Sequence, residues 1–578
     1  MSSGRKEILS YGLLLLGAFA FRFAIARFLP NDTPNDGKVY AQMARNVLEQ
    51  HSYSHATEPP YDPSLIRLPG YPLFLSAIYA GFGHHNNTAV RIVQAILDTA
   101  TCALVALVTF LWEPDQTRKL RSSLAALAVA AACPFTAIYV ATILTETPTL
   151  FLTLAICLTA TLAFKAATFR AGPPAALRRW GAGHSLLLWA ATGVIAGVAV
   201  SFRPDSGLFA AAIGLTLITT FLPRGEAPVD VSGRRYLRRR IFHASSLGAV
   251  FALAFCLVLL PWTIRNERVF HVFQPLAPRH AEMPGEFVPE GYFTWLRTWL
   301  DDERYIGPAL WSLDESAITL EDLPARAFDS VQEKARVGAL LDKYNHPAEA
   351  EIPSSPETSA PATSATAKDQ SNQDQLTSPP ASPADEESDQ DADEDRGNKG
   401  DENDEGDSQD QESQAEEQGW VEMTPEVDAG FAELASERIK RSPLRYYLQL
   451  PARRAMNLWF DTHSQYYPFD GTLLPLEDLD YDIHQQFWLP LFMGLTWLYT
   501  LLGIAGGWFL WRSSQFAARR WLLLCGLFIF LRLTFFSTLE NPEPRYVVEF
   551  FPFLAMLGGI ALARLKWPEA GEHAASTK

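Results

Sequence analysis

Long apolar stretches constrain this chain more than any other feature. A helix needs about 20 mainly apolar residues to cross the hydrocarbon core of a bilayer, and ten stretches come close to that length. They are residues 8–29, 88–111, 121–142, 146–164, 185–201, 205–222, 241–262, 487–511, 519–537 and 544–564. The sequence therefore predicts an all-α polytopic membrane protein with about ten transmembrane helices.

Lys and Arg are concentrated in every second connection between these stretches, which indicates how the chain is oriented. Basic residues precede the first stretch and follow the second, fourth, sixth, eighth and tenth. Because basic loops stay on the cytoplasmic side, we expect a multi-pass protein of the cell (inner) membrane with both termini in the cytoplasm. The extracytoplasmic loops are then 30–87, 143–145, 202–204, 263–486 and 538–543.

The N-terminal stretch also has features of a cleaved signal peptide. Arg5, Lys6 and an apolar run precede the small residues Ala24 and Ala26, as in secretory signals. Arg22 interrupts that run, however, and removing the stretch would invert every loop behind it. We therefore expect it to be a membrane helix.

The net charge of −17 comes from one segment. Residues 351–420 contain 21 of the 65 acidic residues and only three basic ones, so the rest of the chain is nearly neutral. Residues 350–419 are rich in Ser, Pro, Gln, Asp and Glu, and a segment that cannot bury apolar surface is expected to be disordered. No basic stripe indicates a nucleic-acid partner.

These features divide the chain into four parts. We expect an N-terminal membrane domain at 1–264, whose first outer loop is 30–87, and an extracytoplasmic loop at 265–486 that contains the acidic insert 350–419. C-terminal membrane helices follow at 487–566, and a cytoplasmic tail at 567–578. Residues 69–83 are apolar but too short to cross, so we expect a helix in the outer interface.

The first outer loop holds two carboxylates just beyond the first membrane stretch, Asp32 and Asp36. Residues 37–50 have helical periodicity, so Asp36 lies where a helix begins. Asp36 is then either an N-cap, which accepts a backbone N–H, or a general base held at the membrane surface. The two roles are compatible, because a cap also fixes the carboxylate.

Four arginines fall at the outer boundary, where the orientation rule places few of them. They are Arg67, Arg203, Arg265 and Arg545. Each alone is explained by a side chain that snorkels at a helix end, but together they indicate a site for an anion, with Arg545 and Arg265 ranked first. Glu146 opens a membrane stretch, where it either complements the helix dipole or positions an acceptor or a basic partner.

Charged residues also lie inside the apolar stretches, where they are costly and therefore paired or functional. They are Arg22, Asp98, Arg532 and Glu549. We favour mutual pairing, for example of Asp98 with Arg532, over a polar pocket that opens to the outside.

The order of these motifs resembles the GT-C glycosyltransferases. After the first stretch come Asp36, Tyr40 and Ala44 on a short helix, then RLPGYPLFL from Arg67, and then a stretch that opens with Arg91. Further matches are Thr145-Glu146, Pro261-Trp262, Arg265-Asn266 and Arg545-Tyr546. The resemblance covers about 1–270 and 487–566 and is closest to the dolichyl-phosphate-mannose–protein mannosyltransferases and the lipid A aminoarabinose transferases.

The resemblance implies transfer of a sugar from a polyprenyl-phosphate donor to a hydroxyl of an extracytoplasmic lipid, glycan or protein, with inversion. Its catalytic residues would be Asp36, Asp32 and Glu146, and the four arginines would bind the donor phosphate. Residues that position the acceptor would be Tyr40, Tyr71 and Tyr546. Many relatives have a second acidic residue where this chain has Gly37, so Asp32 competes with Asp36 as the base.

No metal or cofactor is expected. All five cysteines lie in apolar stretches, and the adjacent His84 and His85 lack a ligand-spaced partner. No Gly-rich phosphate loop follows a strand, which counts against a nucleotide-sugar enzyme. The alternatives are a lipid-linked glycan polymerase or ligase, a transporter or flippase, for which repeated halves are not evident, and a non-catalytic scaffold.

Overall fold

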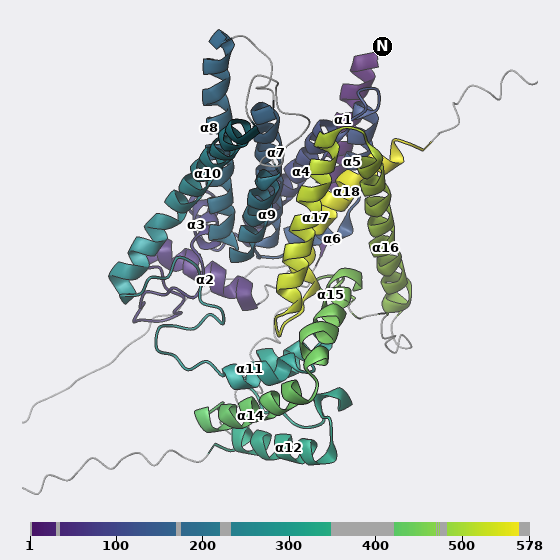
Figure 1. The fold of residues 1–578 in the computed structure, drawn as a ribbon. Coiled ribbons are helices and arrows are strands. Elements are labelled where there is room, and N and C mark those ends of the chain that lie inside the picture. Colours follow the sequence, from purple (N-terminus) through teal and green to yellow (C-terminus); the bar gives the residue numbers. More distant parts are fainter. Residues whose placement is uncertain are drawn as a thin grey trace, which may run out of the picture.

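The computed structural model describes residues 3–29, 35–168, 175–219, 233–347, 421–469, 471, 473 and 483–565. The elements of these ranges are helices (Figure 1). The acidic insert 350–419 and Asp32 both lie outside the described residues.

Seven helices of the described ranges are long and apolar enough to cross a membrane. They are α1 (Ser3–Phe28), α4 (Asn87–Trp112), α7 (Glu146–Thr168), α8 (Ala175–Phe202), α10 (Gly233–Phe270), α16 (Ile483–Arg512) and α17 (Phe516–Ser537). The protein is therefore a polytopic helical membrane protein, as predicted. Figure 1 shows these helices gathered in one bundle.

The other three predicted stretches form shorter or bent helices. α5 (Lys119–Ala131) and the turns at Pro134–Val140 meet at an angle of 53°, and together they make an eighth possible span. Pro134 explains the break, because proline lacks the N–H that would continue the helix. α9 (Gly207–Ile218) and α18 (Phe550–Leu562) are apolar but short. α10 is longer than predicted. It continues to Phe270 and so crosses the predicted domain boundary between residues 264 and 265.

Small residues let two of the long helices approach closely. Gly193 and Gly197 of α8 face α10, and a Cβ added at Gly197 would lie 2.8 Å from the carbonyl oxygen of Phe255. A Cβ at Gly193 would overlap the carbonyl oxygen of Phe251. This small-xxx-small spacing is typical of helix contacts in membranes.

The charges inside the bundle are paired, but not as predicted. Arg22 Nε donates to Asp98 Oδ2 at 2.6 Å, so Asp98 does not pair with Arg532. Arg532 Nη2 instead lies 2.8 Å from Glu549 and 2.5 Å from Asp205. Sequence spacing placed all these groups in apolar surroundings, but it could not tell which helices are neighbours.

Two short helices lie across one end of the bundle (Figure 1). α2 (Asn35–Glu49) packs on α3 (Gly70–Phe82), with Ala44 of α2 buried against Tyr71 and Leu75 of α3. α3 is the short helix predicted at 69–83. The contact holds α2 in place and so fixes the direction in which Asp36 points.

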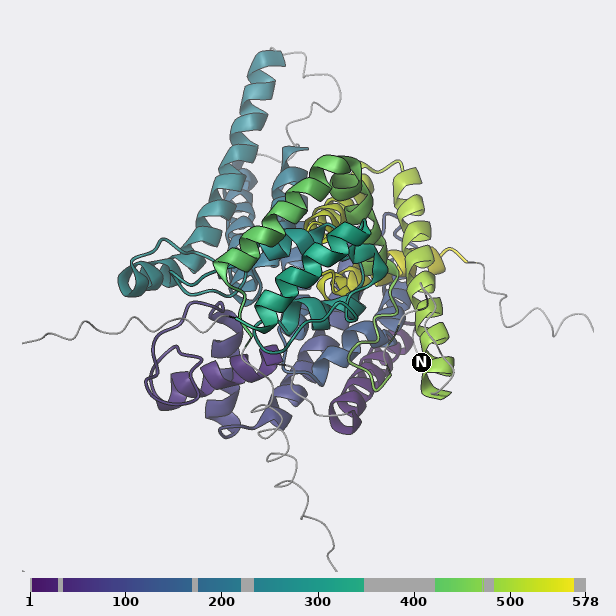
Figure 2. The same cartoon turned by 90° about the horizontal axis from the view of Figure 1, so that it is seen from below.

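A separate helical unit lies beyond that end of the bundle (Figures 1 and 2). We call it the loop domain, residues 288–347 and 421–441, with α11 (Glu290–Arg297), α12 (Val331–Asn345) and α14 (Pro425–Arg441). Its core is aromatic and includes Trp295, Trp299 and Phe431. α15 (Leu450–Phe460) leads from it back to the bundle, where Leu458 is buried in the membrane core.

Candidate active site

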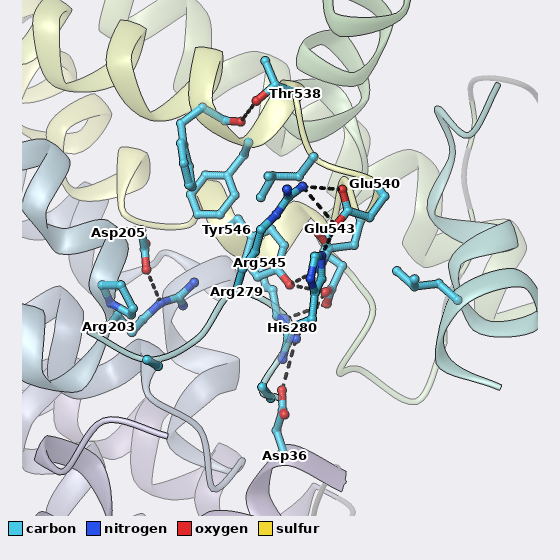
Figure 3. Close-up of a pocket in the computed structure, with 18 of the residues that line it drawn as sticks. Asp36, Arg203, Asp205, Arg279, His280, Thr538, Glu540, Glu543, Arg545 and Tyr546 are labelled. Carbon is cyan, nitrogen blue, oxygen red and sulfur yellow. Dashed lines mark hydrogen bonds and ion pairs between the residues drawn. The ribbon is translucent and has the colours of Figure 1, made fainter. Parts of the chain in front are cut away.

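A cavity of about 1340 Å³ lies between the bundle and the loop domain. Its walls come from α2, the starts of α7 and α9, the segment 276–281, the loop domain, α15 and residues 535–546. Figure 3 shows charged side chains from several of these segments pointing into it. Seven of the predicted site residues line it: Asp36, Tyr40, Arg67, Glu146, Arg203, Arg545 and Tyr546.

Asp36 lies between two arginines. Arg67 Nη2 donates to its Oδ1 at 2.7 Å, and Arg545 Nη2 donates to its Oδ2 at 3.3 Å. Burial alone would raise the pKa of Asp36, but Arg545 and then Arg67 outweigh it and lower the pKa below the usual value. Asp36 is therefore an ionised carboxylate, and it remains one-third exposed to the cavity.

Tyr40 supports this arrangement from the same face of α2, one turn after Asp36. Its ring lies 5.1 Å from the Tyr71 ring in an edge contact, and Arg67 lies over it at 5.8 Å. Tyr71 itself is buried and donates to Gln94 Oε1 at 3.1 Å. Tyr71 thus packs behind Tyr40, outside the residues that line the cavity.

Arg545 is held by a carboxylate of its own segment. Its Nε lies 2.6 Å from Glu543 Oε2, and the hydroxyl of Tyr546 donates to the other oxygen of Glu543. Burial raises the pKa of Glu543, and Arg545 offsets part of this effect. Arg545 Nη1 also reaches the hydroxyl of Tyr466 at 3.4 Å.

A second charged network lies on the cavity wall at the starts of α7 and α9. Arg203 Nη1 donates to Glu146 Oε1 at 2.8 Å, and its Nε donates to Asp205 at 3.2 Å. Asp205 continues the network to Arg532. The second oxygen of Glu146 is buried and finds no hydrogen-bond partner among the described residues.

A third cluster on the cavity wall was not predicted. Glu540 is buried, and Arg279, His280 and Arg297 approach it at 3.0, 3.0 and 3.2 Å. Burial would raise the pKa of Glu540, but these three side chains lower it to about 2. The sequence placed both Glu540 and Glu543 in the outer loop 538–543, and nothing distinguished them from other charged loop residues.

Arg265, which was ranked high from the sequence, does not line the cavity. Its guanidinium lies over the rings of Trp262, Phe270 and Tyr53 at 4.9 to 5.4 Å. Its Nη1 donates to the carbonyl of Ser64 at 2.7 Å. Here Arg265 ties α10 to the first loop, because the helix continues past Pro261 and carries the side chain onto its aromatic face.

The geometry suits an anion beside a base. Arg67 and Arg545 present guanidinium groups to one point of the cavity, and such groups bind phosphate oxygens in pairs. Asp36 accepts from both guanidinium groups. Within the described ranges, no group of three His, Cys, Asp or Glu side chains is placed to hold a metal ion.

The comparisons with known proteins add no family to this description. No protein-family model matches the chain, and neither does any curated protein or solved structure.

Proposed function

We propose that this protein is a membrane glycosyltransferase of the GT-C kind, which transfers a sugar from a polyprenyl-phosphate donor to a hydroxyl of an extracytoplasmic acceptor. The observation that carries the proposal is the position of Asp36 between Arg67 and Arg545 on the wall of a large cavity at the end of a membrane bundle. A lipid-linked donor needs a site at such a boundary, where its tail stays in the bilayer.

The arginines would stabilise the leaving phosphate. As the glycosidic bond breaks, the phosphate oxygen keeps the electron pair and gains negative charge. Donors aimed at that oxygen accelerate the reaction when they bind the transition state more tightly than the substrate. Arg67 and Arg545 are bonded to Asp36, so a phosphate at this point would share their guanidinium groups with the carboxylate.

Asp36 would be the general base. The acceptor oxygen attacks the anomeric carbon, a new bond forms there, and the hydroxyl proton passes to the Asp36 carboxylate. The lowered pKa of Asp36 keeps it ionised, which a base requires before reaction. Attack opposite the phosphate would invert the anomeric configuration. Glu146, one oxygen of which has no hydrogen-bond partner among the described residues, is available to bind a substrate hydroxyl.

We further propose the orientation that this chemistry requires. All ten apolar stretches would cross or enter the membrane, with both termini in the cytoplasm. The basic connections Arg118–Arg121 and Arg512–Arg520 lie at the end of the bundle away from Asp36, which agrees with the positive-inside rule. The cavity would then open to the extracytoplasmic face.

Lipid analysis of cells that lack the gene tests this proposal without knowledge of the sugar. We expect a polyprenyl-phosphate sugar to accumulate and the wild-type gene to clear it. Asp36→Asn should fail to clear it although its membrane level is normal, because loss of a general base costs about 10²–10⁴-fold in rate.

A matched control lies on the same helix. Glu49→Gln removes a carboxylate of α2 that pairs with His84 outside the cavity, and it should clear the lipid as the wild type does. Asp32→Asn in parallel tells which aspartate is the base. Full clearance by Asp36→Asn would refute the proposed role of Asp36.

A further inference from the structure

Two π-helical turns contribute residues to the cavity wall. They are Gly307–Trp311 in the loop domain and Arg445–Gln449 just before α15. Each is closed by the wide hydrogen bond of a π-turn, from Ser312 N to Gly307 O at 3.1 Å in the first. π-turns are rare, and those that occur are frequently at functional sites. The described part of the chain contains these two.

Each π-turn brings an aromatic side chain to the cavity wall. Trp311 is 51% exposed and Tyr447 is 69% exposed, and both line the cavity. Tyr446 supports Tyr447 through an edge contact of 4.9 Å. Single exposed aromatics are ordinary on protein surfaces. Two of them, placed by unusual backbone turns on one cavity, indicate a surface kept open for a ligand.

The polar groups that line the same cavity limit what that ligand can be. Arg279, His280 and Arg297 converge on Glu540, and Arg454 donates to the backbone carbonyls of Leu300 and Arg297, so these cations already have acceptors. An anionic ligand would have to displace Glu540. A continuous apolar lining, as an acyl chain requires, is interrupted by the same charged residues. The wall instead suits a neutral ligand with an apolar face and hydrogen-bonding edges.

A sugar ring has this combination. The C–H groups of one face of a pyranose pack on an aromatic ring, and its hydroxyls reach polar groups at the edge. The cavity is also larger than one small ligand needs, since about 1340 Å³ exceeds the roughly 300–1,000 Å³ of ordinary small-molecule pockets. That volume leaves room for an acceptor beside the donor sugar.

We propose that Trp311 and Tyr447 form the acceptor subsite, and that the acceptor is a glycan whose neutral sugar ring stacks on them. The inference rests on the proposed function, because it places the acceptor in the cavity that would also hold the donor phosphate. It identifies the acceptor as a glycan and not as an anionic lipid or a polypeptide.

Binding of defined probes tests the subsite apart from activity. The full-length protein would be placed in nanodiscs free of sugar detergents and examined by saturation-transfer NMR. The probes are neutral tetrasaccharides of glucose, mannose, galactose and N-acetylglucosamine, with dodecyl phosphate and a serine-containing peptide for the competing acceptor classes. We expect at least one tetrasaccharide to bind through its ring protons.

Substitutions then locate the binding. Trp311→Ala and Tyr447→Ala should each weaken the tetrasaccharide about threefold to tenfold, and Trp311→Phe, which keeps an aromatic face, should largely restore it. Trp508→Ala is the matched control, because Trp508 is 55% exposed on α16 outside the cavity. Trp508→Ala should bind the tetrasaccharide as tightly as the wild type does.

Three results would overturn the proposed subsite. No tetrasaccharide binds, or Trp311→Ala binds the tetrasaccharide as tightly as the wild type does. In the third, only dodecyl phosphate or the peptide binds, and that binding weakens in Trp311→Ala. Failure of the proposed function has a different signature. It would show as the absence of any accumulating polyprenyl-phosphate sugar in cells that lack the gene, a measurement that involves neither aromatic ring.

Discussion

Arg67 is the residue whose removal most cleanly tests the charge arrangement around Asp36. Arg545 cannot be removed alone, because it also neutralises the buried Glu543 at 2.6 Å. Arg67 is one-quarter exposed and bonds to Asp36 at 2.7 Å. Arg67→Gln should lower the rate of donor consumption about 10²–10³-fold if Arg67 stabilises the leaving phosphate.

Arg67→Gln should also change how kcat/KM depends on pH. Arg545 and Arg67 lower the pKa of Asp36, and a base loses activity as the pH falls through its pKa. Without Arg67 that pKa rises, so the acid limb of kcat/KM against pH should move to higher pH. Arg45→Gln, on α2 but outside the cavity, is the control. An acid limb that stays in place would show that Arg67 does not act on the base.

At the scale of residues, the sequence predicted which side chains share one end of the bundle. It could not predict which of them meet. Arg265 was ranked above Arg67, although both lie at the same boundary. In the fold, Arg67 reaches Asp36, whereas Arg265 packs on Trp262 and Phe270. That difference depends on α10 continuing past Pro261, which local sequence does not determine.

Glu540 connects elements that lie far apart in the sequence. It precedes the turn that carries Arg545, and it binds Arg279 and His280 of the segment after α10 and Arg297 of α11. We infer that this cluster sets the loop domain against the bundle. Its members come from three separate segments, so no sequence spacing could reveal it.

Glu540 should therefore make stability depend on pH. Its pKa falls from 4.5 to about 2 on folding, so its contribution is fully present above about pH 4.5 and is lost as the pH falls towards 2. The shift corresponds to stabilisation on the order of 3 kcal/mol. Glu540→Gln should lower the melting temperature at about pH 7 and reduce its fall between pH 5 and about pH 3. Glu286→Gln, whose carboxylate accepts from Met283 N outside the cluster, serves as control, and an unchanged pH profile in Glu540→Gln would contradict the role.

The close contact between α8 and α10 gives a second prediction, which concerns the packing of helices. Gly193→Val would place a branched side chain against the backbone of α10 at Phe251, and overpacking of this kind costs about 1–3 kcal/mol. We expect a lower melting temperature of the purified protein. Gly12→Val is the matched control, because nothing lies within 4 Å of a Cβ built at Gly12. Equal melting temperatures for the two variants would argue against a close contact.

At the scale of the whole molecule, hydropathy was the most informative signal. All ten apolar stretches contain helices, because only helices satisfy the backbone inside a bilayer. Seven of these helices are long enough to cross a membrane. The break at Pro134 and the shortness of α9 and α18 come from local chain geometry. The aromatic core of the loop domain was harder to foresee, since the acidic insert separates Trp295 and Trp299 from Phe431 by more than a hundred residues.

The architecture also predicts that the acidic insert can be removed. The two chain segments that flank it are already joined, because Glu422 N donates to Tyr344 O at 3.2 Å and Met423 N donates to Asp314 at 2.7 Å. Within the described residues, α12 and α14 already pack together in the loop-domain core through Leu341 and Phe431.

Replacing residues 350–419 by a short Gly-Ser linker should therefore leave the melting temperature within a few degrees of the wild type and clear the accumulated lipid normally. Removal of 425–441, which deletes α14, is the contrasting variant and should abolish folding of the loop domain. If the linker variant folds but no longer clears the lipid, the insert itself takes part in the function, and a partner-binding role for the large loop would replace the one argued from the cavity.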